Sequence, residues 1–139
     1  MSKLSSLSRL SLIVACLFVS RGAFAEDAPP KELKALRSSF AGAVAARDFK
    51  AAEALSRFPM PNRVKDAPNS IARADFARWV IMNDFWSHAD CLARAPLTQS
   101  YNDDKTKVDW FVACDHGASL FHFGRVGGRW LFDGFEATR

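Results

Sequence analysis

A chain of 139 residues is long enough for one globular domain, and 49% of its residues are hydrophobic. The formal net charge is +4, but the first 25 residues hold three of the 19 basic residues and no acidic one. Residues 26–139 therefore carry 16 basic residues against 15 acidic ones, without a basic cluster. This balance argues against a nucleic-acid partner, which needs a basic surface.

The N-terminus has the order of a secretory signal peptide. Lys3 and Arg9 precede a mostly apolar run over residues 10–19, and the small-x-small sequence Ala23-Phe24-Ala25 follows. The run is too short for a transmembrane helix. We predict cleavage after Ala25, so that residues 26–139 form a single periplasmic or secreted domain.

A second interpretation of this segment remains open. The sequence Ile13-Val14-Ala15-Cys16 resembles a bacterial lipobox, in which Cys16 would be lipidated and would hold the protein at a membrane as a lipoprotein. The mature N-terminus distinguishes the two interpretations.

The exported chain keeps two cysteines, Cys91 and Cys114. An even number of cysteines in an oxidising compartment predicts a disulfide, here between the start of the expected sheet and the end of a later strand. The loop that it closes would add about 3 kcal/mol of stability in the chain-entropy model. Two separate buried thiols are the alternative.

Three helices are predicted first. Leu33, Leu36, Phe40 and Val44 repeat at helical spacing from about Lys31 onward. A second helix over 49–57 has Asp48 as its N-cap, and the prolines of the connector 58–69 end it. A third, aromatic-rich helix is predicted over 73–86 and has the composition of an element that packs in the core.

Strands are predicted from residue 91 onward. The segment 91–101 reads as an edge strand because Pro96 lies inside it, and a polar turn over 102–105 follows. Residues 108–135 then form three aromatic-rich runs separated by His116-Gly117 and Gly127-Gly128, which predicts a three-stranded antiparallel meander.

Two-residue turns at both dipeptides would divide the side chains of the meander between two faces. The expected core face carries Trp110, Val112, Cys114, Phe121, Phe123, Arg125, Trp130 and Phe132. The second face carries Phe111, Ala113, Leu120, His122, Leu131 and Phe135, with Asp109, Asp115 and Asp133 among them. The apolar groups on this second face predict a pocket, a packed helix or contact with a second copy of the sheet.

Helices followed by about four antiparallel strands predict an α+β fold with the helices on one side of a curved sheet. The order of elements resembles the NTF2-like (SnoaL-like, cystatin-like α+β roll) superfamily. The resemblance is carried by ALRSSFAGAVAARDFKAAEALSRFP, IARADFARWV and FHFGRVGGRWLFDGFEA. It implies the roll fold, but the superfamily includes dehydratases, isomerases, ligand-binding modules and dimerisation domains, so the fold does not assign a function.

The first candidate for chemistry is the pair His122 and Asp133, which the assumed register places directly opposite each other. A carboxylate beside an imidazole raises the pKa of the histidine and fixes its tautomer. The resemblance implies that such a pair can act as a general acid and base inside a cavity, here lined by Phe111, Leu120 and Phe135. A surface ion pair worth under about 1 kcal/mol is the alternative.

A metal site is a weaker candidate. His88 and Asp90 would meet Asp115 and His116 if the disulfide joined their segments. No metal-ligand spacing, dinucleotide fingerprint or phosphate-binding loop is present, so no cofactor and no metal is expected.

Together these features predict an exported, non-catalytic domain that binds a small apolar ligand or a protein partner. The apolar groups on both sheet faces suggest a homodimer. The alternative is a small enzyme of the dehydratase or isomerase type that uses His122 and Asp133.

Overall fold

Two helices begin the domain in the computed structural model, which describes residues 28–64, 69–101 and 108–138. Helix α1 spans Lys31–Ala45 and buries Leu33, Phe40 and Val44 along one stripe. Helix α2 spans Phe49–Ala54, and the Asp48 carboxylate accepts a hydrogen bond of 3.1 Å from the Ala51 amide. The predicted helix start and N-cap are therefore confirmed. The predicted signal peptide and the turn over 102–105 lie outside the described residues.

Short elements follow where one long helix was predicted. Strand β1 (Met60–Pro61) lies in the predicted connector and pairs antiparallel with β2 (Ser70–Ile71), which follows directly after that connector. They are followed by η1 (Arg73–Asp75), α3 (Phe76–Met82), η2 (Phe85–His88) and α4 (Ala89–Arg94). The backbone at Asp84 is left-handed, with φ of 50°, and this residue separates α3 from η2. The single helix predicted over 73–86 is therefore wrong in its continuity.

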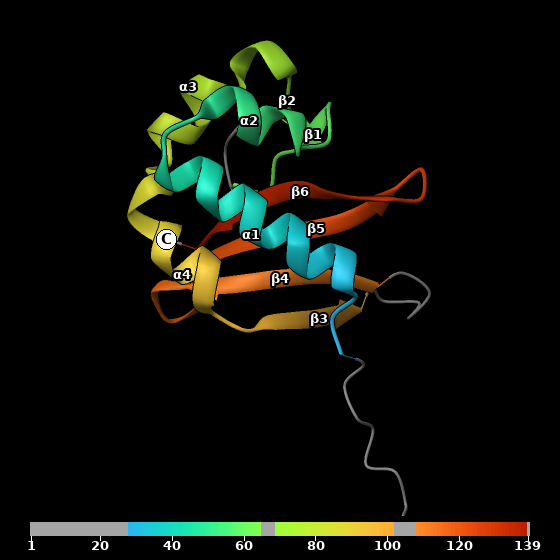
Figure 1. Ribbon diagram of the computed structural model, residues 1–139. Helices are drawn as coiled ribbons and strands as arrows, with labels where there is room; N and C mark the ends of the chain where they lie inside the picture. The colour runs from blue at the N-terminus through green and yellow to red at the C-terminus, as the bar shows by residue number, and fades with distance from the viewer. Residues whose placement is uncertain (1–27, 65–68, 102–107, 139) are drawn as a thin grey trace, which may run out of the picture.

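The four-stranded sheet is an antiparallel meander in the order β3-β4-β5-β6. Its strands are β3 (Leu97–Tyr101), β4 (Val108–Cys114), β5 (Ser119–Val126) and β6 (Arg129–Ala137), and the short helix η3 (Asp115–Gly117) lies in the β4–β5 loop. Helix α1 crosses one face of this sheet and α4 lies beside it, while α2 and α3 stand at the β6 side (Figure 1). The predicted α+β class, with helices on one side of the sheet, is confirmed.

The predicted strand over 91–101 is wrong in its first half. Cys91 lies in helix α4, and the strand begins only at Leu97. The reason is local, because Pro96 forces the residue before it out of the helical region, and Ala95 has φ −64° and ψ 151°. Pro96 therefore separates a helix from a strand.

The predicted register of the meander is confirmed near its turns. Trp110 pairs with Phe123 across β4 and β5, and Arg125 pairs with Trp130 across β5 and β6. The first loop is longer than two residues, since η3 occupies it, but it is centred on the same dipeptide and preserves the pairing.

A β-bulge in β6 shifts the pairing of β5 with β6 by one residue for the part of β5 that precedes Phe123. Phe123 pairs with Phe132, but His122 pairs with Gly134, so Asp133 is an extra residue without an opposite partner. Phe135 consequently faces Phe121 and belongs to the core face. Its predicted place on the second face is wrong because one inserted residue reverses the alternation of every side chain after it.

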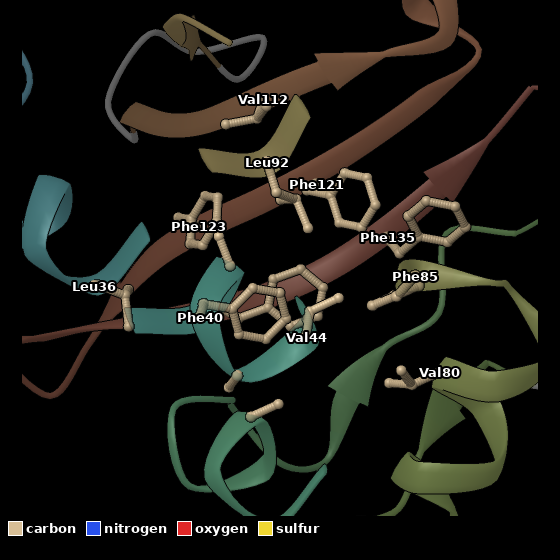
Figure 2. Close-up of a cluster of buried hydrophobic side chains, with 14 of the residues drawn as sticks. Leu36, Phe40, Val44, Val80, Phe85, Leu92, Val112, Phe121, Phe123 and Phe135 are labelled. Atoms are coloured by element: carbon tan, nitrogen blue, oxygen red, sulfur yellow. The ribbon is translucent and has the colours of Figure 1, made fainter. Parts of the chain in front are cut away.

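The core lies between the helices and this face of the sheet, and aromatic rings fill it (Figure 2). Phe40 of α1 stacks on Phe132 with ring centroids 4.3 Å apart, and Phe85 meets Phe121 edge to face at 5.0 Å. Each such buried side chain contributes about 1.5–3 kcal/mol. The largest fully buried side chains are Phe40, Phe76, Phe85, Phe121, Phe123, Phe132, Leu33, Met60, Leu92, Val44, Val80 and Val112.

The predicted disulfide between Cys91 and Cys114 is confirmed, with Cα atoms 6.0 Å apart. It joins helix α4 to the end of β4, not two strands as expected. No helix among the described residues has the length and apolar character that crossing a membrane requires.

Candidate functional site

A polar cleft of about 390 Å³ opens beside the bulge in β6. Three arginines and two aspartates lie at it, together with Pro61 and Gly124. Its lining is Arg57, Pro61, Arg63, Asp109, Gly124, Arg125 and Asp133. The cleft lies at the face of the sheet opposite the aromatic core, which we call the outer face and define by Asp109, Phe111, Leu120, His122, Gly124 and Leu131.

The bulge places a buried carboxylate at this cleft. The Asp133 side chain is only 7% exposed, although it carries a charge. It occupies the space that a side chain at position 124 would take, because a Cβ on Gly124 would lie 2.7 Å from Asp133 Oδ2. The missing side chain of Gly124 and the extra residue of the bulge together make room for Asp133.

Arg57 reaches this carboxylate from the segment after α2. That segment runs beside β6, where the Arg57 amide donates to the Phe132 carbonyl and the Phe132 amide donates to the Leu55 carbonyl, each at 2.9 Å. The guanidinium Nη1 of Arg57 donates to Asp133 Oδ1 at 3.1 Å. Its side chain remains 42% exposed and lines the cleft.

Arg63 follows β1 and covers the far end of the bulge. The chain passes close to β6 there, since a Cβ on Gly134 would lie 3.2 Å from the Pro61 carbonyl oxygen and 3.3 Å from Arg63 Nε. Arg63 Nη2 lies 3.8 Å from Asp133 Oδ2 and 3.9 Å from Asp109 Oδ2. Both distances exceed those of a direct hydrogen bond, so Arg63 attracts two carboxylates without closing on either.

His122 is buried at the inner end of this charged group. Its Nδ1 lies 3.3 Å from Arg63 Nη1 and its Nε2 lies 3.3 Å from Glu136 Oε2. A guanidinium can only donate, so Nδ1 accepts from Arg63 and the Nε2–H donates to Glu136. Burial, followed by the charge of Arg63, lowers the pKa of His122 below its ordinary value of 6.5, while Glu136 opposes the shift. His122 is therefore neutral in this arrangement.

The predicted pairing of His122 with Asp133 is corrected by this geometry. Both side chains are buried at the outer face, but the bulge pairs His122 with Gly134, and Arg63 contacts both side chains. The expected rise in the pKa of His122 is wrong because desolvation and the Arg63 charge outweigh the carboxylates. Whether the two residues catalyse a reaction stays a prediction.

The three predicted pocket residues are not brought together. Phe111 and Leu120 lie half-buried on the outer face, and the Phe111 ring is 6.0 Å from the His122 ring between centroids. Phe135 instead packs in the core, 4.9 Å from both Phe85 and Phe121 between ring centroids.

Only two of the four residues proposed for a metal site lie close to each other. His88 Nδ1 lies 3.3 Å from Asp115 Oδ2, so the segments near the disulfide do converge. Asp90, however, pairs with Arg94 at 3.0 Å on the surface, and His116 is exposed in the loop. Within residues 28–64, 69–101 and 108–138, no group of three or more His, Cys, Asp or Glu side chains is placed to hold a metal ion.

Sequence reasoning missed Arg57, Arg63 and Glu136, which complete the site. Arg57 lies in the segment after α2 and Arg63 lies after β1, and nothing in the local sequence pattern indicates a partner on β6 for either. A signal for the bulge was present, because Gly124 and Gly134 lie inside predicted strands, and an isolated glycine in a strand often marks a bulge or a close approach of another segment.

No protein-family model matches this chain, and no curated protein matches its sequence. Solved structures to which it is similar include two NTF2-like proteins, one of which is described as having a cystatin-like fold. An NTF2-like protein from Novosphingobium aromaticivorans is 16% identical, with a TM-score of 0.43, over 76% of this chain and 77% of that one. An NTF2-like protein of unknown function from Pseudomonas putida KT2440 is 13% identical, with a TM-score of 0.40, over 76% and 82%.

A third similar structure comes from Xanthomonas campestris and is named as a candidate calcium/calmodulin-dependent protein kinase II association domain. It is 15% identical, with a TM-score of 0.42, over 84% of this chain and 92% of that one. At these identities no ligand, activity or assembly passes from these proteins to this chain.

Proposed function

We propose that this protein is an exported, non-catalytic binding domain whose ligand occupies the cleft beside the β6 bulge. One observation carries the proposal: a buried carboxylate, Asp133, holds the half-exposed guanidinium of Arg57 at the opening of a cleft of about 390 Å³. A volume of this size is at the small end of ligand sites in proteins. The lining is polar, so we propose a polar ligand in place of the apolar one that the sequence suggested.

Export is supported by the order of residues 1–25 and by the disulfide between Cys91 and Cys114. Disulfides persist in oxidising compartments such as the periplasm and are rare in reducing ones. Cleavage after Ala25 would release the domain, whereas processing at Cys16 would make it a lipoprotein.

A non-catalytic role is supported by the surroundings of His122. Both of its ring nitrogens already have protein partners, Arg63 and Glu136, and the residue is only 5% exposed. A general base must reach the proton that it removes. His122 would have to lose one of these partners before it could exchange a proton with a substrate.

Native mass spectrometry of the protein, expressed with its own signal peptide and purified gently, tests this proposal. We expect a mature chain that begins at Glu26, lacks two hydrogen atoms because of the disulfide, and carries an additional non-covalent mass. The additional mass should be retained by Arg78→Gln, which changes an exposed arginine outside the cleft, and lost from Arg63→Gln. A clean spectrum without any additional mass would argue against a binding role.

Association with a second copy of the chain is a second candidate. The outer face carries half-buried Phe111 and Leu120, while the helices cover the opposite face of the sheet (Figure 1). Apolar side chains on a face of this kind are common in interfaces. Sedimentation at tens of micromolar protein should show a dimer, and a monomer alone would contradict this candidate.

A further inference from the structure

We infer that the ligand of this cleft is a small organic monocarboxylate, held by the guanidinium groups of Arg57 and Arg63. The inference rests on the proposed binding function and names the chemical class of the ligand. Arginine presents its donors in a planar fork that matches the two oxygens of a carboxylate, and such bidentate pairs are among the strongest hydrogen-bonded contacts in proteins.

A contact with Asp133 orients the guanidinium of Arg57 but uses only one of its hydrogen-bond donors. Among the described residues its guanidinium has one acceptor, Asp133 Oδ1 at 3.1 Å, and this contact uses only Nη1. The guanidinium carries five N–H groups. Because Asp133 is fixed in the bulge, the remaining donors of Arg57 are held at the cleft before any ligand arrives, which reduces the entropy lost on binding.

Arg63 supplies the second set of donors. Its Nη1 faces the unprotonated nitrogen of His122, but its Nη2 stands 3.8 and 3.9 Å from the two aspartates that attract it. A hydrogen bond from nitrogen to oxygen is about 2.9 Å long. Nη2 is therefore attracted to carboxylates but directly bonded to neither, and an incoming carboxylate oxygen can accept from it.

The charge of the lining favours a singly charged anion. Three arginines and two aspartates line the cleft, an excess of one positive charge, and Glu136 lies behind them, 3.3 Å from His122 Nε2. A single negative charge would offset the excess positive charge of the lining, whereas a cation would add to it.

Two apolar side chains of the outer face neighbour residues that line the cleft, although neither of them lines it. Leu131 lies opposite Gly124, and Phe111 lies two residues after Asp109 on the same face. Both side chains are half-buried. A short hydrocarbon chain extending from the carboxylate would cover one or both of them, and this burial of apolar surface would favour binding.

Titration of the ¹⁵N-labelled mature protein, with its disulfide intact, tests the inference by NMR. The probes are hexanoate, hexanamide, hexylammonium and inorganic phosphate at millimolar concentrations. We expect hexanoate alone to shift the amide signals of Gly124, Asp133 and Gly134. Equal or larger shifts with the amide, the ammonium ion or phosphate would overturn the carboxylate assignment while leaving a binding cleft. If none of the probes shifts these amide signals, the inference is overturned. The native mass spectrum then tests the binding role independently of the ligand class.

Matched variants locate the contact. Arg57→Gln and Arg63→Gln should each weaken hexanoate binding by about tenfold or more, and Arg78→Gln should leave it unchanged. Arg57→Lys keeps the charge but removes the fork, and it should also weaken binding. The amide spectrum of each variant reports whether it is folded. Folded Arg57 and Arg63 variants that bind hexanoate as tightly as the parent would overturn the inference.

Discussion

The two faces of the four-stranded sheet use the same strands for different chemistry. On the core face, Phe121, Phe123 and Phe132 are fully buried against the helices, and their contacts are apolar. On the outer face, Asp133 and His122 are buried nearly as deeply but are surrounded by arginines and carboxylates. Apolar burial stabilises a fold directly, whereas burial of charged pairs is often neutral or unfavourable. The core face therefore stabilises the fold, whereas the buried charged groups of the outer face are better explained by ligand recognition.

Alanine substitution on each face should give the largest difference. We expect Phe132→Ala to lower the free energy of unfolding by about 3–5 kcal/mol, because it removes a ring that stacks on Phe40 at the centre of the core. Phe111→Ala on the outer face should lower it by only about 1 kcal/mol. Urea unfolding measures both. Equal losses would break the contrast and would indicate that a second copy covers the outer face.

Removal of the disulfide should have the next largest effect. The bond closes a loop with a sequence separation of 23 and joins α4 to the end of β4. We expect the double variant Cys91→Ala and Cys114→Ala to lose about 3 kcal/mol of unfolding free energy, chiefly because its unfolded chain is less restricted. Parent protein treated with a reductant should match the variant in urea unfolding. A loss well below about 1 kcal/mol would show that the helices hold the core face closed without the bond.

The fit between Gly124 and Asp133 predicts a smaller, local effect. Gly124→Ala places a Cβ 2.7 Å from the Asp133 carboxylate and should lower the unfolding free energy by about 1–3 kcal/mol. Gly42→Ala in α1 is the matched control, because its Cβ meets no atom within 4 Å and alanine favours a helix by about 0.5–1 kcal/mol. Thermal unfolding of both variants should therefore shift in opposite directions. A Gly124→Ala protein as stable as the parent would show that Asp133 is not held tightly.

The pH dependence of stability should show the smallest effect. Burial and the Arg63 charge lower the pKa of His122 in the folded protein below 6.5, so the unfolded chain binds this proton more readily. The stabilising contribution of neutral His122 is full above about pH 6.5 and is lost as the pH falls through the lower folded pKa.

Replacement of the imidazole tests this sign. The groups that face it are Arg63, Glu136 and Asp109, and none of them is changed in His122→Gln. We expect the variant to lose less stability than the parent between about pH 7 and pH 5 in urea unfolding. His116→Asn, at an exposed loop position, should retain the parent slope. A steeper acid loss in His122→Gln would mean that the folded protein prefers the protonated imidazole.

Local sequence patterns determined most of the fold. Helical spacing from Lys31, the Asp48 cap and the two-residue turn at Gly127-Gly128 depend on neighbouring residues, and the structure confirms all three. The loop at His116-Gly117 is longer than predicted, because it holds η3, but it keeps the predicted pairing. Weaker patterns failed where two structures compete over a short segment, as around Cys91, where a helix and a strand were both compatible with the sequence. The first two helices, the antiparallel meander and the disulfide partners were therefore predictable, while β1, β2, the separate helix α4 and several boundaries were not.

The candidate site depended on tertiary structure. Asp133 and His122 were identified as polar residues of one sheet, but a single extra residue at the bulge decided which groups each one meets. Their arginine partners are 76 and 59 residues away along the chain, and no periodicity of the sequence records such a contact. Side-chain alternation is a local property that the order of residues along a strand reveals. The approach of Arg57 and Arg63 to the bulge instead follows from how the segment after α2 packs along β6. Only the folded chain determines that packing.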